Sequence, residues 1–435
     1  MQVCKRLLIV LLATAGSVAA FADQPKPVNR PEELGFASDR LERVTKAFQG
    51  YVDSGQIPGA VVLIARKDKV AYFQAFGYRD REQKIPMTFD TIFRLASMTK
   101  PIVSVGAMML AEEGKLDIAA PVSQYLSEFK DLKVSVEQVD AATGKKETVL
   151  QSPVRPMSVQ DLLRHTAGLV YGPPIGNGPI PDAYRDANVS DRNQTLAEFV
   201  TKISKLPLAN QPGEVWEYSM ATDVLGRVIE VASGMELDAF IDERITKPLG
   251  MTSTGFYVRE ADRDRIAQPQ TDAASGKRPP MFDAAQKPKW FSGGGGAVST
   301  AADYLLFCQM LLHDGSVGSI RLLSPSTVNL MTSNALYPGI RYAAAAQTRF
   351  NDIGPTPAMG QGFGLGFAVR MEKGGNPLPG SVGSFYWTGA YGTTFYIDPK
   401  QQLIIIMMIQ VPGPANTQYR HTVRYLAYQA ITSVD

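Results

Sequence analysis

GAVVLIARKDKVAYFQAFG, residues 59–77, is the stretch of sequence that decides the fold. Two β-rich runs, Gly59–Ala65 and Val70–Gly77, flank the polar turn Arg66-Lys67-Asp68-Lys69, and this pattern predicts a β-hairpin. Further β-rich runs return in the final third of the chain: Phe363–Met371, Gly383–Trp387, Thr393–Asp398 and Leu403–Gln410. The sequence therefore predicts one sheet that is assembled from both ends of the chain.

Helical patterns fill the middle of the chain and also accompany the strands. The middle ones are joined by Pro/Gly-rich loops such as Tyr171–Pro181: Ser158–Arg164, Thr195–Ser204, Ala221–Ser233 and Glu236–Ile245. Three more lie nearer the ends: Ser38–Tyr51, Met98–Glu112 and Thr417–Ile431. We therefore predict a discontinuous α/β sheet domain, residues 23–115 and 291–435, into which a helical lobe, residues 116–290, is inserted.

The composition is that of a globular protein and disfavours several classes of function. The 435 residues include 44 Lys and Arg against 42 Asp and Glu, and the formal charge of +2 gives no electrostatic reason to bind nucleic acid or an anionic membrane. Three histidines in total disfavour a His-rich metal site, and no cofactor is expected. Of the two cysteines, Cys4 lies in the leader described next. Cys308 alone cannot form an internal disulfide, and its helical context predicts a buried apolar thiol.

Residues 1–22 have the three parts of a secretory signal peptide. Lys5 and Arg6 form the positively charged region, Leu7–Val18 the apolar region and Ala20-Phe21-Ala22 the cleavage site. The alternative is a membrane anchor, but 12 apolar residues are too short to span a hydrocarbon core of roughly 30 Å as a helix. We therefore expect cleavage after residue 22 and export to the periplasm or the medium, with no stable membrane anchor.

The chemistry is indicated by a Ser-x-x-Lys pattern, which occurs twice in the sequence. Ser97-Met98-Thr99-Lys100 opens a long apolar helix, whereas Ser127-Glu128-Phe129-Lys130 lies in a polar segment that is typical of a solvated surface. Because residues i and i+3 of a helix share a face, Lys100 Nζ can reach Ser97 Oγ. The alternative is that Ser97 is only a helix N-cap. The Gly-x-Ser-x-Gly motif of the α/β-hydrolases is absent from the sequence.

A serine nucleophile needs a base, and the three histidines are weak candidates for it. Tyr218, in the segment PGEVWEYSM just before a helix, is one candidate, and Lys100 is the other. A tyrosine or a lysine acts as a base near pH 7 only when its pKa is lowered by about 3 units, which a desolvated neighbouring charge can bring about. Two such groups titrate together, so the sequence leaves the position of the proton open.

A third segment, Gly383–Ala390, could line the same site. Its Thr388 and Gly389 would let a substrate approach the backbone closely, and the Ala390 N–H could join the Ser97 N–H in an oxyanion hole. The alternative is an ordinary aromatic-rich strand of the sheet.

Taken together, these segments resemble the serine β-lactamase/penicillin-binding-protein superfamily, and specifically its class C-like branch, which includes the family VIII bacterial carboxylesterases. The resemblance is carried by several motifs in the expected order: FRLASMTK, LLRHTAGL, PGEVWEYSMATDVLGRVIE, KPLGM, SGGGGAVSTAADYLLFCQMLL and GSFYWTGAYGTTFYIDP. It implies an antiparallel sheet flanked by helices with an inserted helical lobe. It also implies that Ser97 is the acylated nucleophile, Lys100 its helper and Tyr218 the general base. The segment Trp387-Thr388-Gly389 would border the site, and the Ala390 N–H would belong to the oxyanion hole.

Two departures from the family pattern bear on the substrate. Met220 stands where class C enzymes usually have the Asn of Tyr-x-Asn, and Trp387 stands where they usually have the lysine of Lys-Thr-Gly. The asparagine binds an amide and the lysine helps to hold a carboxylate, so Met and Trp make the pocket more apolar. This favours a neutral ester over a carboxylated β-lactam.

We therefore predict an exported serine carboxylesterase that cleaves small acyl esters through a metal-free acyl-enzyme at Ser97. The alternatives on the same scaffold are a class C-like β-lactamase, a D-amino-acid peptidase or amidase, and an acyltransferase. A non-catalytic penicillin-binding-like module is the remaining alternative, which an intact set of Ser97, Lys100 and Tyr218 disfavours. The expected partner is a small ester or amide substrate.

Overall fold

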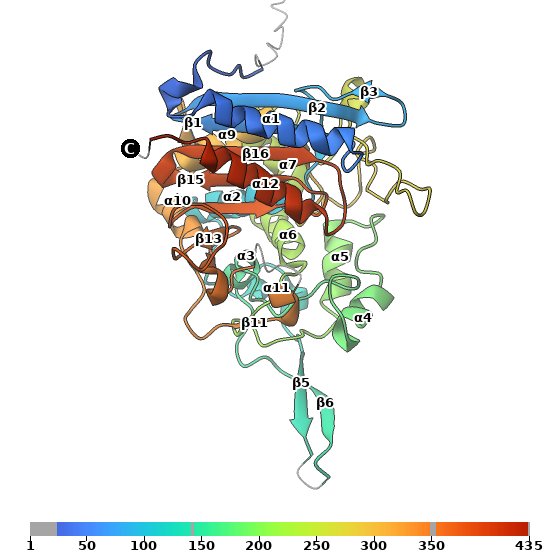
Figure 1. Cartoon of the computed structure of the whole chain (residues 1–435). Helices are drawn as coiled ribbons and strands as arrows, with labels where there is room; N and C mark the ends of the chain where they lie inside the picture. The colour runs from blue at the N-terminus through green and yellow to red at the C-terminus, as the bar shows by residue number, and fades with distance from the viewer. Residues whose placement is uncertain (1–23, 141–142, 349–353, 434–435) are drawn as a thin grey trace, which may run out of the picture.

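The structure is a computed structural model that describes residues 24–140, 143–348 and 354–433, so the predicted signal peptide lies outside the described residues. Figure 1 shows a sheet covered by helices, a helical lobe beside it and a β-hairpin that projects from the lobe. Among the described residues, no helix combines the length and the apolar character that crossing a bilayer requires.

The sheet has eight strands in the order β12-β13-β14-β15-β16-β1-β2-β3, and each neighbouring pair is antiparallel. The strands come from both ends of the chain: β1 Gly59–Arg66, β2 Lys69–Asp80, β3 Ile85–Pro86, β12 Gln361–Phe363, β13 Ala368–Arg370, β14 Phe385–Thr388, β15 Thr394–Asp398 and β16 Leu403–Ile409. The predicted hairpin is β1–β2, and β1 pairs on its other side with β16, with Ile64 opposite Ile405. The prediction of one sheet built from both chain ends is thus confirmed.

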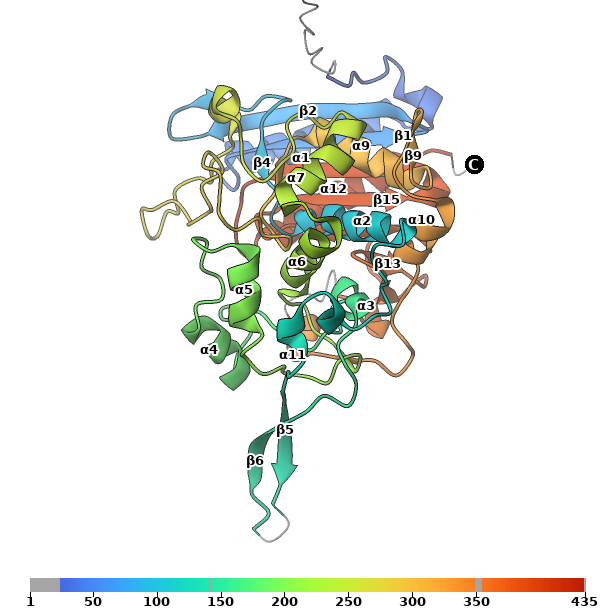
Figure 2. The same ribbon diagram turned by 180° about the vertical axis from the view of Figure 1, so that it is seen from behind.

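The central strands are buried along their whole length because helices cover both faces of the sheet. Every residue of β1 and β16 is buried. The helices α1, Ser38–Asp53, and α12, Asn416–Gln429, lie on one face (Figure 1), while α2, Thr99–Glu112, and α9, Ala301–Leu312, lie on the other (Figure 2). Cys308 is fully buried in α9, as its sequence context predicts.

The predicted run Phe363–Met371 is two short strands, β12 and β13, instead of one. The chain reverses between them, where the N–H of Gly364 donates to the carbonyl of Phe367. A Cβ on Gly364 would lie 2.0 Å from the carbonyl oxygen of Met331, so only glycine fits this tight crossing.

The lobe is mostly helical and packs against the sheet domain through contacts of α6 with α2. Its helices are α3 Val159–Leu163, α4 Pro179–Asp186, α5 Leu196–Ile203, α6 Ala221–Ser233, α7 Leu237–Ile241, the π-helical turn η5 Asp242–Thr246 and α8 Lys247–Leu249. Two features go beyond the sequence prediction. Helix α4 begins inside the expected loop Tyr171–Pro181, and a hairpin, β5 Val134–Val139 and β6 Lys146–Gln151, projects from the lobe (Figure 2).

Shorter elements complete the connections between the two parts. They are β4 Phe93–Arg94, β7 Val215–Trp216, β8 Val298–Ser299, β9 Ser316–Val317, β10 Ile320–Arg321, β11 Arg341–Tyr342, α10 Pro325–Thr332 and α11 Ala344–Thr348. β4 pairs with β8 just before the Ser-x-x-Lys segment, and β11 pairs with β7 in the lobe. The chain after residue 290 therefore contributes to the lobe as well as to the sheet.

Candidate active site

The predicted serine and lysine meet where the sheet domain contacts the lobe. Ser97 lies in a 3₁₀ turn, η2 (Ala96–Met98), that leads directly into α2, and Ala96 before it has a φ of +46°. A positive φ at a non-glycine residue costs energy and is found at sites where the fold imposes it. Lys100 Nζ lies 3.2 Å from Ser97 Oγ, and the lysine side chain is buried. The predicted contact between the two residues is present.

The Lys100 ammonium is held by three acceptors. Besides Ser97 Oγ, it donates to the Tyr171 hydroxyl at 3.1 Å and to the Gly294 carbonyl at 2.6 Å, which matches its three N–H bonds. It also lies 4.7 Å from the centre of the Tyr218 ring. Burial raises the pKa of Tyr171 well above its ordinary value, and the nearby Tyr218 strengthens the effect. Tyr171 is therefore a neutral acceptor that orients the lysine, and sequence reasoning missed it.

The run of four glycines, Gly293–Gly296, lets the backbone approach the buried carboxylate of Asp223. Asp223 Oδ1 accepts bonds from the Gly294 N–H at 3.1 Å and from the Ser292 hydroxyl at 2.6 Å. A Cβ on Gly294 would lie 2.3 Å from Asp223 Oδ2, and one on Gly293 would lie 2.5 Å from a backbone oxygen of α6. Burial raises the pKa of Asp223, while the Lys100 charge opposes this rise.

Tyr218 lies in an aromatic cluster that fixes its ring. Its centroid is 4.8 Å from that of His165, 5.5 Å from that of Tyr171 and 5.5 Å from that of Trp387. His165 is itself buried and has a φ of +57°, and its backbone carbonyl accepts the backbone N–H of Glu217 at 2.9 Å. Burial lowers the pKa of His165 well below its ordinary value, and the Lys100 charge lowers it further. The imidazole is therefore neutral and supports Tyr218 by packing.

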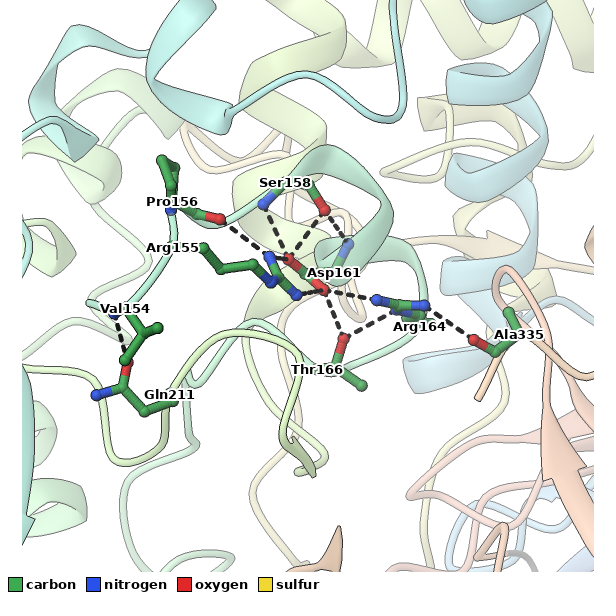
Figure 3. Close-up of polar contacts among 9 residues, drawn as sticks. All are labelled: Val154, Arg155, Pro156, Ser158, Asp161, Arg164, Thr166, Gln211 and Ala335. Carbon is green, nitrogen blue, oxygen red and sulfur yellow. Dashed lines mark hydrogen bonds and ion pairs between the residues drawn. The ribbon is translucent and has the colours of Figure 1, made fainter. Parts of the chain in front are cut away.

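A buried carboxylate, Asp161, bonds the two residues on either side of His165 in the chain, Arg164 and Thr166 (Figure 3). It accepts bonds from Arg155 at 2.6 and 2.9 Å, from Arg164 at 3.0 Å and from the Thr166 hydroxyl at 2.9 Å. It also completes a capping box with Ser158 at the start of α3. Burial favours the neutral acid, but these bonds outweigh it and lower the pKa of Asp161 to about 2. The ionised Asp161 carboxylate therefore holds the turn around His165 in place.

Ser97 and Tyr218 open onto a cavity of about 740 Å³. The other predicted side chains around it are Met220, Trp387, Thr388 and Ala390. Gly389 is not part of this wall. It turns the chain beside it, and a Cβ there would lie 2.2 Å from the carbonyl oxygen of Leu95. Gly389 is thus required for β14 to approach the Ser-x-x-Lys segment.

The second Ser-x-x-Lys pattern has no part in this site. Ser127 and Lys130 are both exposed, which agrees with the predicted solvated surface. The sequence also missed two arginines of the cavity wall, Arg192 in the loop between α4 and α5 and Arg420 in α12. No local pattern marks them, because only the packing of the lobe on the sheet domain brings them to one cavity.

The antiparallel sheet, the inserted lobe and the serine bonded to a buried lysine define a serine hydrolase of the Ser-x-x-Lys class. Residues 44–429 match the sequence profile of the beta-lactamase family. The chain belongs to that family, with the beta-lactamase/transpeptidase-like fold.

Relatives of this chain include a named esterase, which fits an esterase-like branch of the family. Protein Rv1367c of Mycobacterium tuberculosis is 38% identical over 82% of this chain and 87% of its own. Esterase EstB of Burkholderia gladioli is 31% identical over 86% of this chain and 91% of its own. The solved structure of EstCE1, described as a hydrolase with promiscuous acyltransferase activity, matches with a TM-score of 0.72 and 30% identity over 90% of this chain and 99% of that one.

Proposed function

We propose that the protein is an exported serine carboxylesterase that cleaves small acyl esters through an acyl-enzyme at Ser97. The observation that carries the proposal is the bond between Ser97 Oγ and the buried Lys100, in a cavity whose wall has Met220 and Trp387 in place of polar family residues. Similarity to the esterase EstB supports the same reaction. The apolar leader of residues 1–22 supports export.

In the proposed reaction the pair formed by Tyr218 and Lys100 starts with one proton fewer than an ammonium and a neutral tyrosine hold together. Ser97 Oγ attacks the ester carbonyl carbon while its proton passes to this pair. The backbone N–H groups of Ser97 and Ala390 hold the oxyanion of the tetrahedral intermediate. The alkoxide leaves with the proton from the pair, and Ser97 remains acylated. Water then loses a proton to the same pair and attacks the acyl carbon, which releases the acid and regenerates Ser97. Where an alcohol takes the place of water, the same steps transfer the acyl group, as the description of EstCE1 suggests.

The test compares the purified protein with Ser97→Ala and Tyr218→Phe on p-nitrophenyl butyrate and on a chromogenic cephalosporin. We expect the wild type to cleave the ester, to take up a fluorophosphonate label and to lose both properties in Ser97→Ala. Faster turnover of the cephalosporin than of the ester would reject the esterase assignment. A wild-type rate in Tyr218→Phe would remove Tyr218 as the base.

A further inference from the structure

The cavity beside Ser97 is lined by two positively charged side chains that come from different parts of the fold. Arg192 belongs to the loop between α4 and α5 in the lobe, and Arg420 belongs to α12 on the sheet. The one carboxylate among the described residues around this cavity is Asp223. That carboxylate is buried, is bonded by Ser292 and Gly294, and lies near the Lys100 charge. A ligand in the cavity therefore meets two guanidinium groups and no accessible negative charge.

The flat face of the Arg192 guanidinium lies over an aromatic ring. Its central carbon lies 4.8 Å from the centre of the Phe282 ring, and that ring is 6.5 Å from the ring of Tyr391 in the cavity wall. A cation held over an aromatic face keeps its N–H bonds free at the edge. Arg192 is exposed, and among the residues that the structure describes we find no carboxylate in an ion pair with it. Its charge also reaches the cavity floor, where it opposes the rise in the pKa of Asp223.

Arg420, in α12 of the sheet domain, adds a second positive charge to the cavity wall. Its guanidinium donates to the Gly389 carbonyl at 2.5 Å, which holds it beside the turn that carries Ala390. The wall also contains the aromatic side chains of Tyr171, Trp290, Trp387 and Tyr391. Arginine binds carboxylates through paired N–H bonds.

We propose that the natural esters of this site carry a carboxylate on the part that extends toward Arg192, whose guanidinium edge binds it. This inference rests on the proposed esterase function and deepens it. It departs from the neutral ester that Met220 and Trp387 favoured from the sequence, because the lysine missing at Trp387 is replaced by cations from elsewhere in the fold. The anionic group distinguishes the substrate and takes no part in the acyl-transfer chemistry.

Two matched pairs of esters test the proposal and assign the carboxylate to one side of the ester. In the first pair the leaving alcohol carries the group, as 4-carboxyphenyl butyrate against 4-carbamoylphenyl butyrate. In the second the acyl part carries it, as the 4-nitrophenyl monoester of glutaric acid against that of glutaramic acid. We expect kcat/KM of the wild type to favour the anion of at least one pair by about tenfold, mainly through KM. The preference should weaken as salt is raised to about 0.5 M.

Substitutions at Arg192 connect that preference to one side chain. Arg192→Gln should lower the ratio of the two kcat/KM values to between about 1 and 3, and Arg192→Lys should keep an intermediate ratio, because it retains the charge but loses the paired N–H bonds. The matched control is Arg185→Gln, which removes an exposed arginine of α4 that is paired with Asp182 and Asp186. It should leave the ratio at the wild-type value.

A binding experiment separates this inference from the esterase proposal. The amide analogues 4-butanamidobenzoate and 4-butanamidobenzamide would be titrated calorimetrically into Ser97→Ala with and without Arg192→Gln. Ester cleavage without a charge preference in either pair, or a preference that survives Arg192→Gln, overturns the carboxylate site and leaves the esterase function in place. Tighter binding of the benzoate that requires Arg192, in a protein that cleaves no ester, supports the anion site and overturns the esterase function.

Discussion

Asp223 and Lys100 hold the same residue, Gly294, from opposite sides. Asp223 Oδ1 accepts the Gly294 N–H at 3.1 Å, and Lys100 Nζ donates to the Gly294 carbonyl at 2.6 Å. Asp223 takes no part in the acyl transfer. Its buried carboxylate positions the Gly294 backbone, which in turn positions Lys100. The serine, the lysine and the glycine run form one connected unit.

Replacing Asp223 should disturb the lysine without touching the serine. We expect Asp223→Ala to lower kcat/KM for an ester by about 10- to 100-fold, because the backbone that holds Lys100 is no longer fixed. Asp223→Asn should lose less, since its amide oxygen can still accept the Gly294 N–H. Steady-state kinetics on both variants, with circular dichroism as a folding control, measure the difference. Equal losses in the two variants would show that the charge matters and the position does not.

Gly294→Ala should damage both stability and activity. The new Cβ would lie 2.3 Å from Asp223 Oδ2 and 3.0 Å from its Cγ, so the carboxylate or the backbone must move. We expect Tm to fall by several degrees and kcat/KM to fall with it. Gly50→Ala is the control, because Gly50 is an exposed residue of α1 with no atom within 4 Å of the added Cβ. That variant should gain roughly 0.5–1 kcal/mol, and a comparable loss in both would refute the steric argument.

Asp161→Asn should destabilise the fold by about 2–3 kcal/mol, because the buried carboxylate loses its charge and two partly exposed arginines, Arg155 and Arg164, lose their charge partner. The native pKa of about 2 lies below the ordinary value of 3.8, so the ionised carboxylate stabilises the fold above that ordinary value. This contribution, about 2.5 kcal/mol, is lost as the pH falls from about 4 to 2. Urea unfolding of wild type and variant at pH 7, 4 and 2.5 measures it.

Asp186→Asn is the matched control for the Asp161 experiment. Asp186 pairs with Arg185, but both side chains are more than half exposed. Removing an exposed pair should cost about 1 kcal/mol or less at every pH. If Asp161→Asn lowered the free energy of unfolding no more than this control, the Asp161 contacts drawn in Figure 3 would not hold the turn in place.

Glu217, the residue before Tyr218, gives the opposite pH dependence. Burial raises its pKa to about 7, against the hydrogen bond from Asn210, so the folded protein prefers the protonated acid. Stability should therefore fall as the pH rises from about 4.5 to 7, by up to about 3 kcal/mol. Glu217→Gln removes this loss and should be more stable than wild type at pH 8, with no gain near pH 5. Chemical denaturation at both pH values decides, and a gain of equal size at both would contradict it.

The sequence by itself determined the elements whose cause is local. The β-rich apolar runs predicted β1, β2, β15 and β16 within a few residues, because a buried strand requires apolar side chains that can be read directly from the sequence. The spacing of Ser97 and Lys100 predicted their contact, because three residues of helix bring two side chains to one face. The family resemblance placed Tyr218, Met220 and Trp387, which all line the cavity.

The sequence did not predict helix α4 or the hairpin of β5 and β6. Helix α4 begins at Pro179, inside a Pro/Gly-rich loop, because proline at the first helical position sacrifices no hydrogen bond. The strands β5 and β6 mix apolar and polar residues and are mostly exposed, so no continuous buried face marks them in the sequence. None of these three elements contributes a residue to the cavity wall.

Only the tertiary structure decided the surroundings of the serine. Tyr171, Gly294 and Asp223 meet Lys100 from positions about 70 to 200 residues away in sequence, and these contacts arise only when the lobe packs on the sheet domain. The same packing brings Arg192 and Arg420 to one cavity. The identity of the nucleophile is thus a local property of the sequence, whereas the charge that the substrate meets is a property of the assembled fold.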